Sequence, residues 1–407
     1  MTSWLSSNSS RGSSSAEEGS SVTERRKSLA LSLLNELKVG ADLTRRRLPT
    51  QDCLRACSLL EVTADFFASS ELLMEAAEAT EPVESLALLV KWYLKGLFAS
   101  TNGAALSRPL NPLLGEIFRC TWRCSDGGGS NKLRFVAEQV SHHPPISAFH
   151  ACCQERGVEV WGQLSPQASY LSSSAFSTSF ALAPTDADSE SAGENFAVAL
   201  GAETYSVTLP TAFVRSLLTG PRFELGGKVT IACLQSQLTA SQVFHAKAFY
   251  GGEAHEVTGD IRRAGVEPSS EEILCKMSGD WTDTVDFVFL GGGGEEERRE
   301  SFVVKPQPEE GKDGGNCQRL IRPLVQQQRL ESRQLWHSVF TALEKGQWEE
   351  ADRAKAELER KQRQYLTGLT PSLPHKTQYF EQQQQQQPTT GNGTAPVTKW
   401  TVKRDAQ

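Results

Sequence analysis

The feature that most restricts how this chain can fold is a series of short segments in which apolar and polar residues alternate. Alternation with a period of two gives a β-strand one apolar face and one polar face. Turn-forming pairs such as Gly226-Gly227 and Gly251-Gly252 separate the segments. Many such strands in series predict one large antiparallel sheet or barrel. The clearest segments carry Val158 and Val160; Tyr205, Val207 and Leu209; Val229, Ile231 and Cys233; Val257, Gly259 and Ile261; and Ile273, Cys275 and Met277.

Helical patterns precede and follow these strands. Closely spaced apolar groups between about Ser58 and Phe98 predict a helical region. Later in the chain, an apolar stripe ended by Gly346 is followed by a densely charged helix from Gln347 to about Tyr365. Strands and helices do not alternate and no glycine-rich nucleotide motif is present, so we expect an α+β fold that is mainly β. The stripe consists of Leu335, Trp336, Val339, Phe340 and Leu343.

The two ends of the chain differ in composition from the part between them. Residues 1–25 are rich in Ser, Glu and Gly and are expected to be disordered. Residues 26–40 predict a short amphipathic helix, and the spacing alone favours an ordinary surface helix. The run GGGGEEERRE at 291–300 predicts a mobile loop. Residues 381–407 are typical of a Gln-rich, low-complexity tail in which Trp400 is an isolated apolar residue.

Charge and cysteine content narrow the class of protein. The net charge of −7 argues against general nucleic-acid binding, which needs a basic surface. The first residues lack the apolar core of a signal peptide, and the most apolar stretch is too short to span a membrane. We therefore expect a cytosolic chain whose nine cysteines are reduced thiols. Cys53/Cys57 and Cys120/Cys124 have C-x3-C spacing, but no second pair completes a zinc site, so no metal is expected.

The segment EQVSHHPP at 138–145 contains the most distinctive chemistry of the sequence. A proline restricts the residue before it, so His143 and Pro144 are predicted to be extended. Two adjacent imidazoles could donate hydrogen bonds and, when protonated, positive charge to an anion. Metal ligation is a weaker alternative because no further ligand lies at a familiar spacing. A bare His-His pair, taken alone, would more often be two ordinary loop histidines.

This segment resembles the signature of the oxysterol-binding protein-related family, without a mismatch. The resemblance covers about residues 29–380 and is to a short form without a pleckstrin-homology domain. Other segments resemble the same family in the same order: LKVGADLT at 37–44, VKWYL at 90–94, RPLNPLLGE at 108–116, FYGG at 249–252, GDW at 279–281, ESRQLW at 331–336 and ADRAKAELERKQR at 351–363.

The resemblance implies a large incomplete antiparallel β-barrel, at 41–380, that encloses a hydrophobic tunnel and carries C-terminal helices. It assigns residues 26–40 to a lid helix instead of a plain surface helix. It also implies exchange of phosphatidylinositol 4-phosphate for a sterol or phosphatidylserine between membranes, with no enzymatic activity and no cofactor. The chain would be cytosolic and peripheral at endoplasmic reticulum, Golgi or endosome contact sites. The leucines expected at the lid and tunnel are Leu33, Leu34, Leu37 and Leu43.

The family's headgroup-binding positions map onto this chain as follows from the resemblance. His142 and His143 would hold the 4-phosphate, and Asn111 would contact the headgroup. Arg108 stands where the family has a lysine, which keeps the charge but changes the geometry. On the last helix, Lys355, Glu359 and Arg363 lie at i, i+4 and i+8 and would also reach the inositol phosphates or hydroxyls. Without the resemblance, these three would be read as solvated ion pairs.

Two other functions compete with lipid transfer. A hydrolase could use Ser141 and His142 as nucleophile and base, but the chain has no GxSxG segment. A lipid sensor or scaffold that does not transfer its ligand would keep the barrel. Nothing in the strands separates sterol from phosphatidylserine, and the Arg45-Arg46-Arg47 run departs from the family pattern beside the lid.

Overall fold

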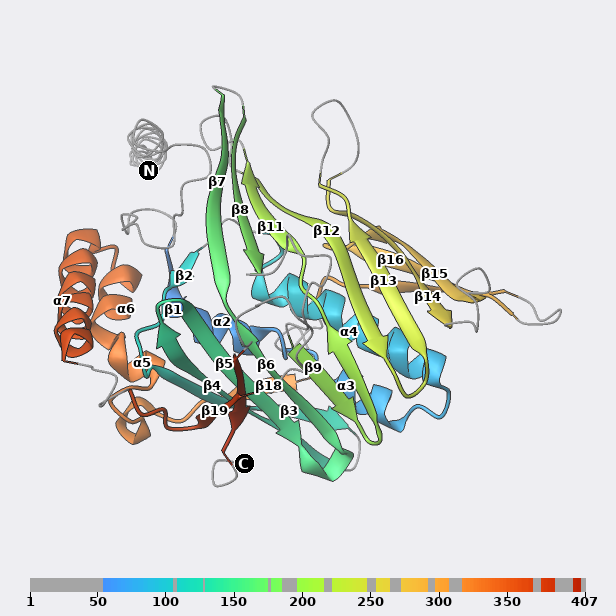
Figure 1. The fold of residues 1–407 in the computed structure, drawn as a ribbon, viewed down its shortest axis with the longest axis horizontal. Helices are drawn as coiled ribbons and strands as arrows, with labels where there is room; N and C mark the ends of the chain where they lie inside the picture. The colour runs from blue at the N-terminus through green and yellow to red at the C-terminus, as the bar shows by residue number, and fades with distance from the viewer. Residues whose placement is uncertain are drawn as a thin grey trace, which may run out of the picture.

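The structure is a computed structural model. An antiparallel sheet of sixteen strands forms most of it (Figure 1). The structure describes residues 54–104, 108–126, 129–174, 177–184, 196–215, 222–246, 254–263, 272–291, 297–306, 317–368, 375–384 and 398–403. The predicted lid helix at 26–40, with Leu33, Leu34 and Leu37, lies outside these residues, as do Leu43 and Gly251-Gly252.

The sheet is largely a meander, because strands that follow one another in sequence are mostly neighbours in space. Its order is β17-β16-β15-β14-β13-β12-β10-β9-β6-β5-β4-β3-β18, and β11, β8 and β7 extend it beside the first part of β12. The strands are β3 (Ile117–Asp126), β4 (Gly129–His142), β5 (Pro145–Cys153), β6 (Val158–Leu164), β7 (Pro166–Ser174), β8 (Ser177–Pro184), β9 (Phe196–Leu200), β10 (Glu203–Val207), β11 (Thr211–Arg215), β12 (Arg222–Cys233), β13 (Leu238–Phe244), β14 (Glu256–Arg263), β15 (Glu272–Asp280), β16 (Thr284–Phe289), β17 (Arg298–Val303) and β18 (Cys317–Leu320).

The alternating segments of the sequence form strands as predicted. They lie in β6, β10, β12, β14 and β15, with only Leu209 beyond the end of its strand. In β13 every second residue is buried, which is the pattern of a strand with one face on the core. Within the described residues the edge strands β17 and β18 do not pair with each other. The prediction of a mainly β fold with an incomplete antiparallel barrel is therefore confirmed.

The prediction of a turn at Gly226-Gly227 is wrong, because both residues lie inside β12. Residues 222–226 of this strand pair with β11, whereas residues 231–233 pair with β10. Gly227 has φ +99°, a conformation that residues with a Cβ rarely adopt. Gly227 therefore lies where β12 changes its pairing partner from β11 to β10. Alternation in the sequence does not reveal such a change.

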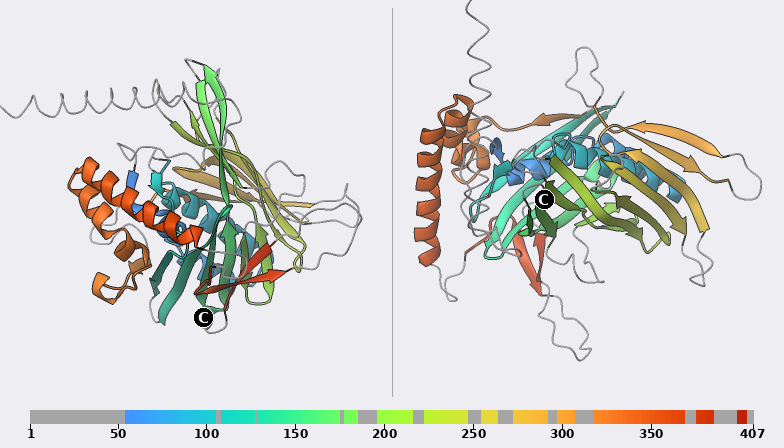
Figure 2. Two further views of the ribbon diagram at one scale, coloured as in Figure 1. Left: turned by 60° about the vertical axis from the view of Figure 1, so that its left-hand side comes forward. Right: turned by 90° about the horizontal axis from the view of Figure 1, so that it is seen from above.

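Three helices lie on the inner face of the curled sheet: α2 (Leu59–Asp65), α3 (Glu71–Glu78) and α4 (Pro82–Ser100) (Figures 1 and 2). They confirm the predicted helical region. α2 contacts β3 and β4, α3 contacts β6 and β9, and α4 contacts β13 and β14. Trp92 of α4 is fully buried, and Phe66 packs edge-on against it with ring centroids 5.1 Å apart. Gly96 makes room for Phe66, because a Cβ there would lie 2.7 Å from the ring.

Helices and two small sheets complete the structure at its C-terminal end. The charged helix α7 (Trp348–Thr367) lies outside the sheet at one end of the molecule (Figure 2). The predicted stripe forms α5 (Ser332–Leu335) and α6 (His337–Glu344), and Gly346 follows them with φ +70°. The described residues also form two two-stranded sheets: β1 (Leu54–Ser58) pairs in parallel with β2 (Arg108–Leu110), and β19 (Phe380–Gln384) pairs antiparallel with β20 (Thr398–Val402). No helix of the described residues is long and apolar enough to cross a membrane.

Two predictions about irregular segments need correction. The run at 291–300 was assigned to a mobile loop, yet residues from Arg298 onward form β17 and pair with β16. The described parts of 381–407, assigned to a low-complexity tail, contribute β19 and β20. Trp400 is not isolated, because it packs with Val402 against an apolar cluster that includes Phe380. In both segments, pairing with another strand determines the structure, and the amino-acid composition does not reveal that pairing.

The expectation that all cysteines are reduced is also wrong for one pair. Cys124 in β3 and Cys317 in β18 form a disulfide across a sequence separation of 193 residues. Strand pairing brings them together, which spacing in the sequence could not reveal.

Candidate functional site

The two histidines of the distinctive segment lie at the tip of the β4–β5 hairpin. His142 pairs with Pro145 across the hairpin, so His143 and Pro144 form the turn between the strands. The peptide bond between them is cis. The prediction that these two residues are extended is therefore wrong, because the pairing of β4 with β5 continues up to the turn and the chain must reverse there. The imidazole rings of His142 and His143 lie with centroids 4.5 Å apart.

Helix α7 supplies the other side of this site. The side-chain amide of Gln362 lies 3.3 Å from Nδ1 of His142. One turn earlier, Nζ of Lys355 and Oε1 of Glu359 form an ion pair of 2.7 Å. Both side chains are partly buried, as expected for groups facing a neighbour instead of open solvent. The structure thus places Gln362 of α7 against the β4–β5 hairpin that carries the two histidines (the histidine hairpin), and Lys355 is linked to this region through its ion pair with Glu359.

Burial and charge together set the protonation of His142. Partial burial lowers the pKa of this imidazole below its ordinary value, and the neighbouring His143 lowers it further. The carboxylate of Glu359 acts in the opposite direction and raises it. The carboxylate of Glu359 therefore lies close enough to the hairpin to influence the protonation of His142.

The loop after β2 packs against the same helices. Leu110 and Leu113 flank Asn111, and both leucines are buried in a cluster with residues of α6 and α7, including Ala351. Asn111 itself is exposed. For Arg108 the structure describes the backbone, as the first residue of β2, and its side chain lies outside the described part. Arg363 is exposed on α7 one turn beyond Glu359. The binding roles of these residues stay predictions.

A fully buried carboxylate, which sequence reasoning missed, joins the three parts of the site. Glu116 accepts hydrogen bonds from the backbone N–H of Leu113 at 2.9 Å, from Nε1 of Trp336 at 2.8 Å and from Oγ of Ser332 at 2.7 Å. Burial raises the pKa of Glu116, while hydrogen bonds from Ser58, Ser332, Leu113 and Trp336 lower it. The carboxylate of Glu116 thereby fixes the loop that follows β2 and contains Asn111 (the Asn111 loop) to α5 and to the start of α6, which precede α7 in the chain.

Two further carboxylates reinforce this arrangement. Oε1 of Glu331, just before α5, lies 3.2 Å from the Arg119 guanidinium of β3 and also pairs with Arg322. Glu138 of β4 accepts backbone hydrogen bonds of 2.7 Å from Gln378 and Tyr379. The signal for all three lay in the sequence, since each belongs to a segment that resembles the family. What the sequence did not show was which partners they hold.

Replacing Glu116 by Ala should lower the free energy of unfolding by about 3 kcal/mol or more, because it opens a gap in the interior and leaves the buried N–H of Leu113 and Nε1 of Trp336 without their acceptor. Thermal or urea unfolding of the full chain measures the change. Glu344→Ala, an exposed glutamate on α6, is the matched control and should change stability by less than about 0.5 kcal/mol. Equal effects of the two substitutions would contradict the bracing role of Glu116.

Comparison with known proteins agrees with the motifs. The family model described as oxysterol-binding protein matches residues 32–405. Human oxysterol-binding protein-related protein 10 is 34% identical over 388 residues, which cover 89% of this chain and 47% of that protein. Protein 9 of the same series from Xenopus tropicalis is 34% identical over 363 residues, 85% of this chain and 45% of that protein. The chain thus spans about half the length of these relatives.

Solved structures share the fold. The Osh1 ORD domain in complex with cholesterol superposes with a TM-score of 0.68 at 22% identity, covering 92% of this chain and 86% of that one. The Osh3 ORD in complex with PI(4)P, from Saccharomyces cerevisiae, gives 0.58 at 17% identity, covering 87% and 86%. With a family model over most of its length and relatives at 34% identity, this chain belongs to the oxysterol-binding protein family.

Proposed function

We propose that this protein transfers lipids between intracellular membranes by exchanging phosphatidylinositol 4-phosphate for a sterol or phosphatidylserine. The observation that carries the proposal is the approach of α7 to the histidine hairpin: Gln362 lies 3.3 Å from His142, Glu359 acts on the pKa of His142, and Lys355 is ion-paired with Glu359. Imidazole, ammonium and amide groups are hydrogen-bond donors that suit a phosphate. The membranes concerned, the cytosolic location and the lid at 26–40 are part of the proposal.

The polar groups would recognise the headgroup. A hydrogen bond from a charged donor to phosphate contributes roughly 1.5–3 kcal/mol, so a few of them give useful selectivity. Lys355 is ion-paired with Glu359. On binding, the phosphate would replace Glu359 as the partner of Lys355, and Glu359 could then accept a hydrogen bond from an inositol hydroxyl.

The barrel would provide for the lipid tails. At about 0.8 kcal/mol per methylene, exposing two acyl chains of roughly thirty methylenes to water costs on the order of 25 kcal/mol, so lipids leave membranes slowly on their own. An apolar interior removes much of this barrier without a covalent step. Related ORD domains have been solved with ergosterol, with cholesterol and with PI(4)P, which supports one fold serving both classes of lipid.

Replacing both His142 and His143 by Ala should reduce extraction of phosphatidylinositol 4-phosphate from liposomes by at least about a hundredfold, because two phosphate donors are lost. Extraction of labelled sterol or phosphatidylserine should change little. His337→Ala, an exposed histidine on α6, is the control. Equal loss for every lipid would argue against a separate headgroup site. A wild-type protein that extracts lipid but moves none between two liposome populations would indicate a sensor.

Lys355→Ala should weaken binding of phosphatidylinositol 4-phosphate about tenfold or more, because one charged donor is removed. Lys361→Ala makes a matched control on the same helix, since Lys361 is exposed and pairs with Glu357 at 3.4 Å. Binding to liposomes that contain the phosphoinositide compares the two variants. If both lose affinity to the same extent, the helix acts through general charge and not through a defined site.

Binding of the phosphoinositide should strengthen about three- to tenfold as the pH falls from about 7.5 to about 6.2. The pKa of His142 is lowered in the free protein, so this ring is largely neutral at the upper pH and gains its proton, and with it charge, as the pH falls. Titration of liposome binding at constant ionic strength measures the trend. The His142→Gln, His143→Gln double variant should lack it. Affinity that stays level or falls in the wild type would contradict a role for the imidazoles.

A further inference from the structure

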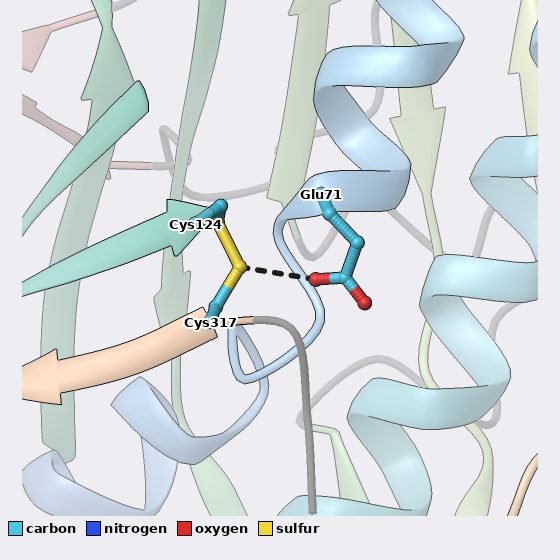
Figure 3. Close-up of side chains that lie close together, drawn as sticks. All are labelled: Glu71, Cys124 and Cys317. Atoms are coloured by element: carbon cyan, nitrogen blue, oxygen red, sulfur yellow. Dashed lines mark hydrogen bonds between the residues drawn. A yellow bond between two sulfur atoms is a disulfide. The ribbon is translucent and has the colours of Figure 1, made fainter. Parts of the chain in front are cut away.

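A second cluster of reactive groups lies away from the headgroup site, at the edge of the sheet. It consists of Cys124, Cys317 and Glu71, all of which are buried (Figure 3). Cys124 belongs to β3 and Cys317 is the first residue of the edge strand β18, and the two face each other across the antiparallel pair. They are bonded as a disulfide, while Glu71 reaches the sulfur of Cys317 from the first turn of α3.

The position of Glu71 is informative because it suits the reduced state. Oε2 of Glu71 lies 3.0 Å from Sγ of Cys317. A thiol at this distance would donate its S–H to the carboxylate, whereas a disulfide sulfur has no proton to donate. Glu71 can therefore accept a hydrogen bond from Cys317 only when the two cysteines are reduced. For this reason the carboxylate favours the dithiol. A neighbouring carboxylate also disfavours the thiolate that is needed for oxidation.

The surrounding cysteines do not share this arrangement. The other described cysteines, Cys57, Cys120, Cys152, Cys153, Cys233 and Cys275, are free and buried. Burial raises the pKa of the thiols of Cys57 and Cys120 to about 12, which makes them poor nucleophiles. Among the described cysteines, Cys124 and Cys317 are the two that face each other closely enough to be bonded.

A metal site is the competing interpretation of the same residues. The possible ligand atoms of Glu71, Cys124 and Cys317 lie within 4.8 Å of one another. Structural zinc sites, however, use four protein ligands, and the described residues supply three here. The sulfur–sulfur bond also occupies both of the atoms that zinc would need.

We propose that Cys124 and Cys317 form a reversible thiol–disulfide clasp between β3 and β18, with Glu71 favouring its dithiol form. The reaction partner is a low-molecular-weight disulfide such as oxidised glutathione. The thiolate of Cys317 attacks it, forming a mixed disulfide and releasing one reduced glutathione. Cys124 then attacks the Cys317 sulfur and releases the second. Two electrons pass to the reagent, and the two thiol protons end on the two glutathione thiols.

The edge position of β18 explains how buried sulfurs can react. β18 spans only Cys317–Leu320 and pairs with β3 alone, so local opening of this short strand exposes Cys317. In the closed state, Arg319 of β18 pairs with Glu61 at 3.1 Å and also with Asp65 on α2. Its guanidinium lies over the ring of Trp122 in β3.

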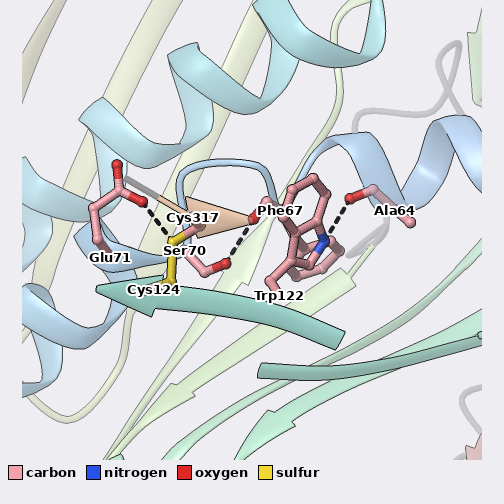
Figure 4. Close-up of a disulfide and its surroundings, with 7 residues drawn as sticks. All are labelled: Ala64, Phe67, Ser70, Glu71, Trp122, Cys124 and Cys317. Atoms are coloured by element: carbon pink, nitrogen blue, oxygen red, sulfur yellow. Dashed lines mark hydrogen bonds between the residues drawn. A yellow bond between two sulfur atoms is a disulfide. The ribbon is translucent and has the colours of Figure 1, made fainter. Parts of the chain in front are cut away.

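Oxidation would fasten this edge covalently. Nε1 of Trp122 donates to the backbone oxygen of Ala64, and Oγ of Ser70 donates to that of Phe67 beside the disulfide (Figure 4). The ion pairs of Arg319 thus hold β18 in the reduced and in the oxidised protein. The disulfide adds a covalent bond in the oxidised protein only. A crosslink over 193 residues restricts the unfolded chain strongly, which raises stability. β18 is followed by a 3-10 turn at Leu324–Gln326 and then by α5, so the disulfide fastens the strand from which the chain runs to the C-terminal helices.

Equilibration of the full-length protein in buffers of reduced and oxidised glutathione tests the proposal. After thiols are blocked, mass spectrometry should find the Cys124 and Cys317 peptides linked in oxidising buffer and separate in reducing buffer, with full return between them. Oxidation should raise the thermal midpoint by at least about 3 °C. Glu71→Gln should shift the equilibrium about five- to tenfold toward the disulfide, because the carboxylate no longer favours the thiol.

The controls separate redox chemistry from loss of folding. The double variant Cys124→Ser, Cys317→Ser should abolish the response of the thermal midpoint to the redox buffer. The redox titration of the wild-type protein tests the proposal without any variant. Three outcomes would overturn the proposal: no linked peptides at any ratio, linked peptides that persist after reduction of the folded protein, or about one equivalent of zinc bound to the purified protein with both thiols protected.

Discussion

The structure depends on the burial of α4 against the inner face of the sheet. Leu86, Leu89, Trp92 and Tyr93 of this helix are fully buried, and each large apolar side chain contributes about 1.5–3 kcal/mol on burial. Within the described residues the first and last strands of the sheet, β17 and β18, do not pair with each other. Contacts with the enclosed helices fasten these two edges. Lys91 of α4 pairs with Glu300 of β17 at 2.6 Å, and Arg319 ties β18 to α2.

The candidate site follows from the same constraint. Helix α7 is densely charged, and Ala351 is its one fully buried residue among those that the structure describes. Trp348, Ala354 and Leu358 give it a narrow, partly buried apolar side. It is held through α6 and the Asn111 loop, which Glu116 joins by hydrogen bonds to Leu113, Ser332 and Trp336. The position of Lys355 and Glu359 relative to the histidine hairpin thus rests on a carboxylate in the interior, away from the ligand-binding groups themselves.

Period-two alternation and helical stripes were sufficient to predict the strands, the helices and the mainly β class, because these patterns follow from local geometry. Long-range pairing was not accessible in this way. Gly226-Gly227 carries the composition of a turn but lies within β12, and the Gln-rich segment after Phe380 pairs with a strand that begins at Thr398. The family resemblance pointed to His142 and Glu359, and the structure places Glu359 near enough to act on the pKa of His142. The resemblance did not indicate Gln362 at 3.3 Å from His142, since a glutamine on a polar helix has no distinguishing pattern.

Neighbouring groups of the site balance the charge of Lys355 and limit that of His142. Lys355 is paired with Glu359, and burial together with His143 keeps the pKa of His142 low. A cluster of uncompensated cations would bind phosphate more tightly but would release it slowly and would destabilise the empty protein by mutual repulsion. If the site binds a phosphoinositide as proposed, binding exchanges one anionic partner of Lys355 for another. The difference between bound and free states is then moderate, which is what a protein that must give up its ligand at a second membrane requires.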